Sequence, residues 1–323
     1  MSQKRILIIS LSNLGDAILT YPTLQGLWDA FPKSEFHVLA SARTQELFEG
    51  DPRIHRVWVW EKEAPVFQQA RMIGQLFFLR FHLVVDFRNS LTPLFLLGAR
   101  RTPLFRKTLG NPLHRVEQHL KLLQTLGVPM PQGASSWMRP PAALPYGPKE
   151  EQWVSSTIQS GRPVIVMAPG ARSHLKRWAP ERFAAVADRL ILEQQAQIFL
   201  VGDGLEQEIS HQVRSAMREQ VLDLTGRTSL RQTFALLNKA RMVITNDSAC
   251  LHAADAMGVA TVAIFGPTDE KKYGPRLPQS RVIRRQLVCA PCERALCPYG
   301  HECMRGLEAD EVYEAAVKVL TNT

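Results

Sequence analysis

The stretch VITNDSACLHAADAMGVATVAIFGPTD, Val243–Asp269, decides the fold. A nearly continuous apolar run ends at Asn246, and a helical pattern follows over Ala249–Met257. A second apolar, β-branched run then occupies Thr261–Phe265. Strands that are buried on both faces give such continuous apolar runs, and a helix between two of them is the usual crossover between parallel strands. The stretch therefore predicts a strand–helix–strand unit of a parallel sheet.

The same alternation recurs along the whole chain. The linker is expected at PMPQGASSWMRPPAALPYGP, 129–148, because its prolines and small residues cannot continue a helix or a central strand. We predict two doubly wound α/β domains, 1–148 (with this linker) and 149–323, which face one another across a cleft. Ligands of such sheets lie beyond the carboxyl ends of the strands. The expected strands are Arg5–Ser12, Phe36–Ala40, Val57–Trp60 and Leu83–Phe87, then Val164–Ala168, Gln197–Gly202, Val221–Leu224, Met242–Asn246 and Thr261–Phe265.

The composition of the 323 residues limits the class of protein. Lys and Arg number 39 against 30 Asp and Glu, which gives a net charge of +9 and favours an anionic partner: nucleic acid, a membrane surface or a phosphorylated substrate. We find no run of 18 apolar residues and no signal-peptide pattern. Four of the five cysteines fall within 289–303, unlike a secreted disulfide framework. These features predict a cytoplasmic protein.

An anion site is expected where the strand before Asp247 ends. Asp247 or Ser248 can cap the following helix, and the free N–H groups of its first turn, with the positive end of the helix dipole, attract an anion. His252, one turn further, can add a donor. The competing interpretation is a plain capped helix with His252 packed against the sheet.

Two further loops follow predicted strands. PGARSHLKRWAPERF, 169–183, is expected to expose four basic side chains, among which Lys176 suits phosphate; a solvated basic loop is the alternative. In VGDGLEQE, 201–208, Glu206 can accept hydrogen bonds from ribose hydroxyls. Together the three strand ends predict a site for a nucleotide diphosphate. The fingerprint G-x-G-x-x-G is missing from both halves, which counts against a dehydrogenase. The four basic side chains are Arg172, His174, Lys176 and Arg177.

A single acid stands in the first loop, LSNLGDAILTYP, 11–22. Gly15 is expected to permit a tight turn after the first strand, and Asp16 to begin the next helix. Position alone favours Asp16 as a helix cap. The nucleotide site predicted on the other domain favours it as a catalytic base, because an enzyme with its site in a cleft between two domains needs a base that faces the cleft. Asp16 can serve as both.

Four motifs resemble glycosyltransferase family 9, the bacterial lipopolysaccharide heptosyltransferases: NLGDAILTYP, LKRWAPERFAAVADRL, DLTGRTSLRQTFALL and TNDSACLHAADAMGVATVAIFGPTD. They lie in the family's order and span both domains. The resemblance implies the GT-B architecture, two Rossmann-like domains around a central cleft. It also implies transfer of heptose, with inversion, from ADP-L-glycero-D-manno-heptose to the inner core of lipopolysaccharide.

The resemblance also implies roles for individual residues. Asp16 matches the catalytic base, and Lys176 the lysine that contacts the donor phosphate. Glu206 matches a ribose-binding acid, and Thr228 lies on the turn beside the adenine. Ala249 stands where many members have glycine, which affects the fine geometry of the donor. The diphosphate-binding turn, which follows Asp247, is matched by Ser248, Ala249, Cys250 and His252.

Cationic and amide donors can replace a divalent metal in such a transfer, so no metal is required for the chemistry. A separate question is the pattern C-x2-C-x4-C-x5-C, which can hold a structural zinc. Its spacing is uncommon for zinc, so free thiols or a labile disulfide remain the favoured alternatives. The cysteines are Cys289, Cys292, Cys297 and Cys303.

The segment 86–121 mixes apolar and basic residues. This mixture suits a lipid-linked, anionic lipopolysaccharide core acceptor and peripheral contact with the cytoplasmic face of the inner membrane. Solvated basic residues on a loop and a helix are the alternative. Two other functions stay open: a sugar-nucleotide epimerase of similar fold, and a non-enzymatic polyanion-binding protein. Nucleic acid is not an expected partner. The basic residues are Arg88, Arg100, Arg101, Arg106, Lys107, Arg115 and Lys121.

Overall fold

The computed structural model of the chain describes residues 4–61, 63–96, 100–104, 113–129 and 144–322. The chain divides into two compact units, Met1–Trp137 and Met138–Thr323. Most of the proposed linker and the basic residues Arg106 and Lys107 lie outside the described residues.

The first unit is built on a parallel sheet with strand order β3-β2-β1-β4-β5. Its strands are β1 (Arg5–Ile9), β2 (Glu35–Ser41), β3 (Arg56–Trp60), β4 (Leu83–Asp86) and β5 (Arg100–Arg101). Its helices are α1 (Leu14–Ile18), α2 (Tyr21–Ala30), α3 (Gln45–Phe48), α4 (Val66–Phe78), the 3-10 turn η1 (Thr92–Phe95) and α5 (Arg115–Thr125).

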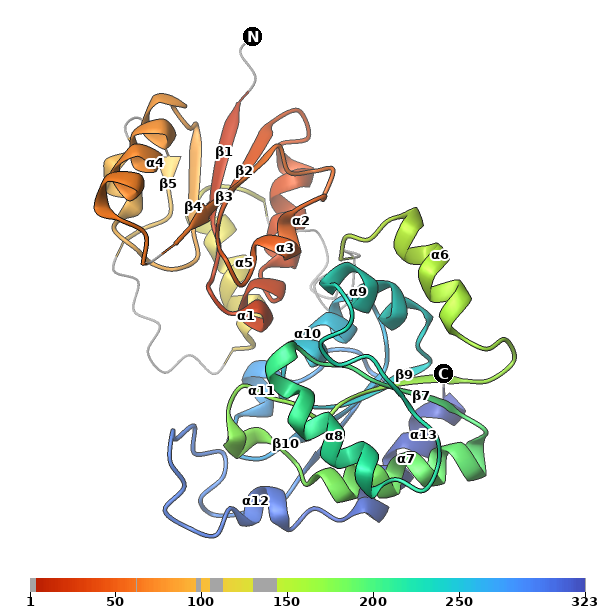
Figure 1. Ribbon diagram of the computed structural model, residues 1–323. Coiled ribbons are helices and arrows are strands. Elements are labelled where there is room, and N and C mark those ends of the chain that lie inside the picture. Colours follow the sequence, from red (N-terminus) through yellow and green to blue (C-terminus); the bar gives the residue numbers. More distant parts are fainter. Residues whose placement is uncertain (1–3, 62, 97–99, 105–112, 130–143, 323) are drawn as a thin grey trace. The chain divides into compact units, whose positions relative to one another are not determined.

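Helices cover both faces of this sheet. Figure 1 shows α4 on one side of the strands and α2 with α5 on the other. Leu76 of α4 packs against alternate residues of the strands, among them Leu7 and Ile9 of β1 and Val84 of β4. Alternate residues of a strand point to opposite faces, so the fully buried Ile6 and Ile8 serve the other layer. The continuous apolar runs of the sequence follow from this burial on two sides.

The second unit repeats the plan with a six-stranded parallel sheet, in the order β11-β10-β9-β6-β7-β8. The buried residues of α7 and α13 pack on one face of its central strands. Its strands are β6 (Val164–Ala168), β7 (Gln197–Leu200), β8 (Leu222–Asp223), β9 (Met242–Asn246), β10 (Thr261–Phe265) and β11 (Arg281–Arg284). The helical elements are α6 (Pro148–Thr157), η2 (His174–Lys176), α7 (Pro180–Gln194), η3 (Gly204–Glu206), α8 (Gln207–Ala216), α9 (Leu230–Lys239), α10 (Ala249–Ala256), α11 (Glu270–Tyr273), α12 (Glu302–Arg305) and α13 (Ala309–Asn322).

Both sheets have the Rossmann strand order, which reverses between β1 and β4 in the first unit and between β6 and β9 in the second. The predicted α/β fold class is therefore confirmed. Two strands were missed, β5 and β11, because both lie at sheet edges and carry arginines at either end instead of an apolar run. The first strand was predicted too long, since β1 ends at Ile9 and the backbone then turns toward α1.

Candidate active site at the strand ends of the second unit

The loop after β6 is attached to the end of β9 by one buried amide. Asn246, which has no exposed surface, donates from Nδ2 to the Pro169 carbonyl at 2.7 Å. Its Oδ1 accepts from the Trp178 N–H at 3.1 Å. These bonds fix both ends of the segment that carries Lys176, at the point where the strand order reverses. Sequence reasoning missed Asn246; the available signal was a polar residue at the end of a buried strand.

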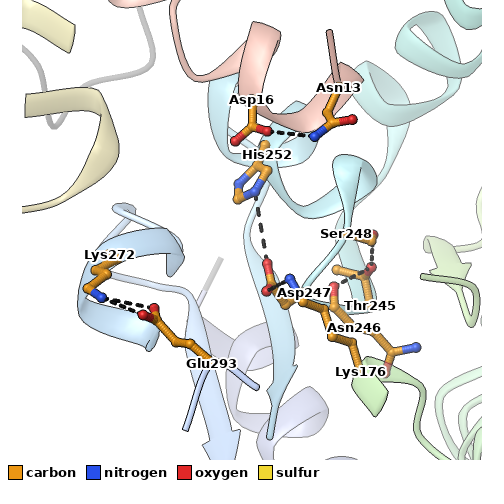
Figure 2. Close-up of polar contacts among 10 residues, drawn as sticks. All are labelled: Asn13, Asp16, Lys176, Thr245, Asn246, Asp247, Ser248, His252, Lys272 and Glu293. Carbon is orange, nitrogen blue, oxygen red and sulfur yellow. Dashed lines mark hydrogen bonds and ion pairs between the residues drawn. The ribbon is translucent and has the colours of Figure 1, made fainter. Parts of the chain in front are cut away.

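Asp247 brings two candidate phosphate ligands together (Figure 2). Lys176 Nζ donates to Asp247 Oδ2 at 2.6 Å, and His252 Nε2 lies 3.9 Å from Asp247 Oδ1. The Asp247 side chain is 4% exposed, whereas that of Lys176 is 32% exposed. The carboxylate is therefore buried, whereas part of the lysine side chain that pairs with it reaches solvent. Its negative charge makes Asp247 a support for Lys176 and a poor direct ligand for an anion.

The N-terminus of α10 follows directly. Ser248 occupies the N-cap position, but its hydroxyl pairs with that of Thr245 at 3.0 Å (Figure 2). Ser248 is thus the N-cap residue, as expected, but among the residues that the structure describes neither its side chain nor that of Asp247 makes a capping hydrogen bond to α10. Ala249 and Cys250 form the first turn of this helix. Burial and the nearby Glu206 carboxylate raise the pKa of the Cys250 thiol to about 12, which keeps it neutral.

Glu206 lies at the neighbouring strand ends. A Cβ added to Gly170 would come within 2.2 Å of its carboxyl carbon, and one added to Gly202 within 2.7 Å of its Oε2. Glycine at both positions thus makes room for this side chain. Glu206 Oε2 also accepts from the Asp203 N–H at 3.0 Å. Burial raises the pKa of Glu206 against the opposing effect of that hydrogen bond.

The other predicted residues of this unit have ordinary surroundings. Thr228, on the turn between β8 and α9, is half-buried and pairs with the Thr233 hydroxyl at 3.0 Å. The basic loop is not uniformly exposed as expected. Lys176 turns toward Asp247, and Arg177 donates to the Ala171 carbonyl at 2.8 Å. The two exposed residues are Arg172 and His174.

Asp16 belongs to the first unit, on the helix that follows β1. The N-cap position is Asn13, and Asp16 lies in the first turn of α1, so the helix-cap interpretation is wrong. Gly15 lies within the helix and forms no turn at the strand end, which corrects a second expectation. Asn13 Nδ2 donates to Asp16 Oδ2 at 3.1 Å, and Asp16 is half-buried (Figure 2).

Arg88 crosses the point where the strand order of the first unit reverses. It follows β4, and its Nε donates to the Ser10 carbonyl at the end of β1. Burial lowers its pKa. Its buried Nη2 has no hydrogen-bond partner among the described residues. A guanidinium here can receive an anionic group, a property that the sequence assigned only to the whole segment 86–121.

The four clustered cysteines line a cavity of about 630 Å³ next to the Lys176 loop. Their segment contacts that loop, because His301 Nε2 lies 2.5 Å from the Leu175 carbonyl. All five cysteines of the chain fall in described ranges and are free thiols. Burial and the three neighbouring thiols raise the pKa of Cys303. Within the described part of the chain, no three of these sulfurs come within 4.8 Å of one another.

A different group has metal-ligand spacing, namely Glu35, His37 and His55 of the first unit. Trp58 Nε1 donates to His37 Nδ1 at 3.2 Å, which leaves the proton of the neutral ring on Nε2. That nitrogen then has no lone pair for a cation. Arg5 Nε also holds Glu35 at 3.0 Å. The group is better explained as a polar cluster around the buried His37.

The second unit thus offers a lysine, a histidine and a helix N-terminus to an anion, with a carboxylate at the adjacent strand ends for hydroxyl groups. This combination suits a nucleotide diphosphate. Two Rossmann-order units with such a site in one of them are typical of glycosyltransferases of the GT-B class.

Comparison with known proteins identifies the family. The family model of glycosyltransferase family 9 (heptosyltransferase) matches residues 100–302, more than half of the chain, and the chain belongs to this family. Lipooligosaccharide heptosyltransferase 2 of Campylobacter jejuni (serotype O:6) is 26% identical over 95% of this chain and 96% of its own length.

Solved structures support the fold. The structure of E. coli ADP-heptose lps heptosyltransferase II has a TM-score of 0.79 at 23% identity and covers 98% of this chain and 99% of its own. A glycosyltransferase family 9 protein from Veillonella parvula also has a TM-score of 0.79, at 22% identity, with 99% and 98% covered.

Proposed function

We propose that this enzyme transfers heptose from ADP-L-glycero-D-manno-heptose to the inner core of lipopolysaccharide, with inversion at the anomeric carbon. The observation that carries the proposal is the Lys176–Asp247–His252 array beside the N-terminus of α10, where the strand order reverses. The names of two relatives support the choice of heptose and of the acceptor. One is a lipooligosaccharide heptosyltransferase, and the other is an ADP-heptose lps heptosyltransferase.

The proposed reaction is a direct displacement. The acceptor hydroxyl gives its proton to the Asp16 carboxylate while its oxygen attacks the anomeric carbon. The bond from that carbon to the diphosphate breaks, and ADP leaves with the electron pair. Lys176, the first N–H groups of α10 and His252 stabilise the charge that develops on the diphosphate, and Asp247 positions Lys176. Glu206 binds the ribose, and Thr228 lies beside the adenine. These protein donors suffice without a divalent metal.

The acceptor is proposed to be lipid-linked and anionic, bound by the first unit in contact with the inner membrane. Arg88 supports this part, because its guanidinium is half-buried at the ends of β1 and β4. No helix within the described ranges is long and apolar enough to cross a bilayer.

The test supplies ADP-heptose with defined truncated core acceptors and follows the mass of the product. Addition of one heptose to an acceptor supports the proposal. Conversion of the donor in the absence of acceptor would instead indicate an epimerase. Asp16→Asn is expected to lower turnover by at least about 10²-fold, because the base is lost, while ADP binding persists. Asp29→Asn, an exposed carboxylate paired with Gln25 on α2, is the matched control. Equal turnover of Asp16→Asn and wild type would remove Asp16 from the mechanism.

A further inference from the structure

Helix α4 has apolar residues on two opposite faces. Leu76 is buried in the core of the first unit, and Met72 packs beside it. On the other side, Phe67, Gly74 and Phe78 share one face at spacings of seven and four residues. Phe67 is 70% exposed and Phe78 is 81% exposed. A surface helix normally carries polar residues on its outer face, so this outer face is suited to an apolar partner.

The neighbouring turn η1 extends this apolar area. A hollow of about 490 Å³ lies between the two elements and is lined by Ala70, Ile73, Gly74, Phe77, Leu94 and Phe95. We define the α4–η1 surface by its exposed apolar residues. These are Val66, Phe67, Phe77, Phe78, Leu91, Leu94 and Phe95.

The charges around the α4–η1 surface are mainly positive, although two exposed acids, Glu61 and Glu63, precede α4. Residues 64–96 and 100–104 contain five arginines and a single acid, Asp86, which is buried at the end of β4. Arg71 lies on α4 itself and Arg80 just beyond its end, and both are exposed. Arg101 is exposed on the edge strand β5 and donates to the Pro93 carbonyl of η1 at 3.0 Å. Figure 1 shows α4 beside β4 and β5 in this unit.

We propose that the α4–η1 surface docks on an anionic lipid bilayer. Exposed phenylalanines enter the boundary between headgroups and acyl chains, and the arginines contact anionic headgroups. A second copy of the chain would bring the arginines of the two copies together, and nucleic acid would leave the exposed aliphatic residues Val66, Leu91 and Leu94 without an apolar environment. This docking rests on the proposed function, because a lipid-linked acceptor lies in a membrane. It is tested by vesicle binding alone, with no measurement of enzymatic turnover.

The experiment is flotation of the full-length protein with vesicles at low salt. Wild type is expected to float with phosphatidylglycerol-containing vesicles and to remain below with phosphatidylcholine vesicles. Phe67→Asp and Phe78→Asp are each expected to lower the partition coefficient by about tenfold or more, because an inserted phenylalanine becomes a charge. Arg71→Gln is expected to lower it by about fivefold. The matched control is Leu192→Asp on α7 of the second unit, at a leucine that is 65% exposed, and it is expected to float like wild type.

Three results would overturn the proposal. The first is that wild type fails to float with the anionic vesicles, and the second is that both Phe→Asp variants float as well as it does. The third is a dimer in gel filtration that Phe78→Asp dissociates, with no vesicle binding; this would assign the surface to self-association. Neither result bears on heptose transfer to a soluble truncated acceptor, so the proposed function can fail or stand independently.

Discussion

Replacement of Lys176 by methionine separates the two roles that the geometry gives this lysine. The ammonium that donates at 2.6 Å to the Asp247 carboxylate is lost, and that carboxylate is 4% exposed. Loss of a partner from a buried polar group costs about 1–3 kcal/mol, and from a fully buried ion pair about 3–5 kcal/mol. Because 32% of the Lys176 side chain is exposed, we expect the lower range, about 2 kcal/mol of the free energy of unfolding.

Turnover should fall for a different reason. A positioned donor to a developing oxyanion contributes about 10²–10³ in rate, so Lys176→Met should lose that factor. The double variant Lys176→Met/Asp247→Asn replaces the buried charge with a neutral amide. It should recover most of the stability but none of the turnover. Urea unfolding and a steady-state transfer assay measure the two effects on the same preparations.

The matched control is Lys272→Met. Lys272 pairs with Glu293 at 2.8 Å in the same unit, but the two side chains are 29% and 42% exposed (Figure 2). Its loss should cost less than about 1 kcal/mol and leave turnover unchanged. The reasoning is refuted if Lys176→Met keeps turnover within about threefold of wild type, or if the double variant regains it.

Three further predictions concern Glu206, His37 and the cysteine cluster. Burial raises the pKa of Glu206, so on acidification ADP binding should begin to weaken at a higher pH than it would with an ordinary glutamate. Glu206→Gln should remove this pH dependence when binding is measured by calorimetry. A pH profile that is unchanged in the variant would exclude Glu206 from ribose binding. Burial lowers the pKa of His37 from 6.5 to about 4, so between these pH values the unfolded chain binds a proton that the folded chain does not. The free energy of unfolding, measured with urea, should therefore fall as the pH is lowered from 6.5 to 4, by about 2 kcal/mol at pH 5. His37→Gln should abolish that loss. No three sulfurs of the cysteine cluster converge in the described chain, so metal analysis should find well under one equivalent of zinc, and a full equivalent would contradict this.

Local signals in the sequence determined most of the fold. The strands β6, β9 and β10 have the bounds that their apolar runs predicted, because a strand buried on both faces needs nearly every residue to be apolar. The edge strands β5 and β11 escaped this reasoning. Their ladders are completed by one neighbour only, and arginines are tolerated there.

The site could be located by sequence but not assembled. Loops at strand ends were recognisable, and so were Lys176 and His252 as anion donors. The contact between Lys176 and Asp247 joins residues 71 positions apart, and it exists because β6 and β9 are neighbours in the sheet. Asp16 was recognisable as an acid near a helix start, whereas its place in the first turn depended on where β1 ended.

The sequence alone thus determined the parallel α/β layout, the family resemblance and the chemical nature of the candidate groups, since these depend on residue type and short-range spacing. The tertiary structure alone decided which polar groups meet and which apolar residues stay exposed. Helix α4 illustrates the second point: Phe78 and Leu76 are equally apolar in sequence, and only packing buries Leu76 and leaves Phe78 at the surface. Hydrophobicity describes a residue, but burial depends on the strands and helices that surround it.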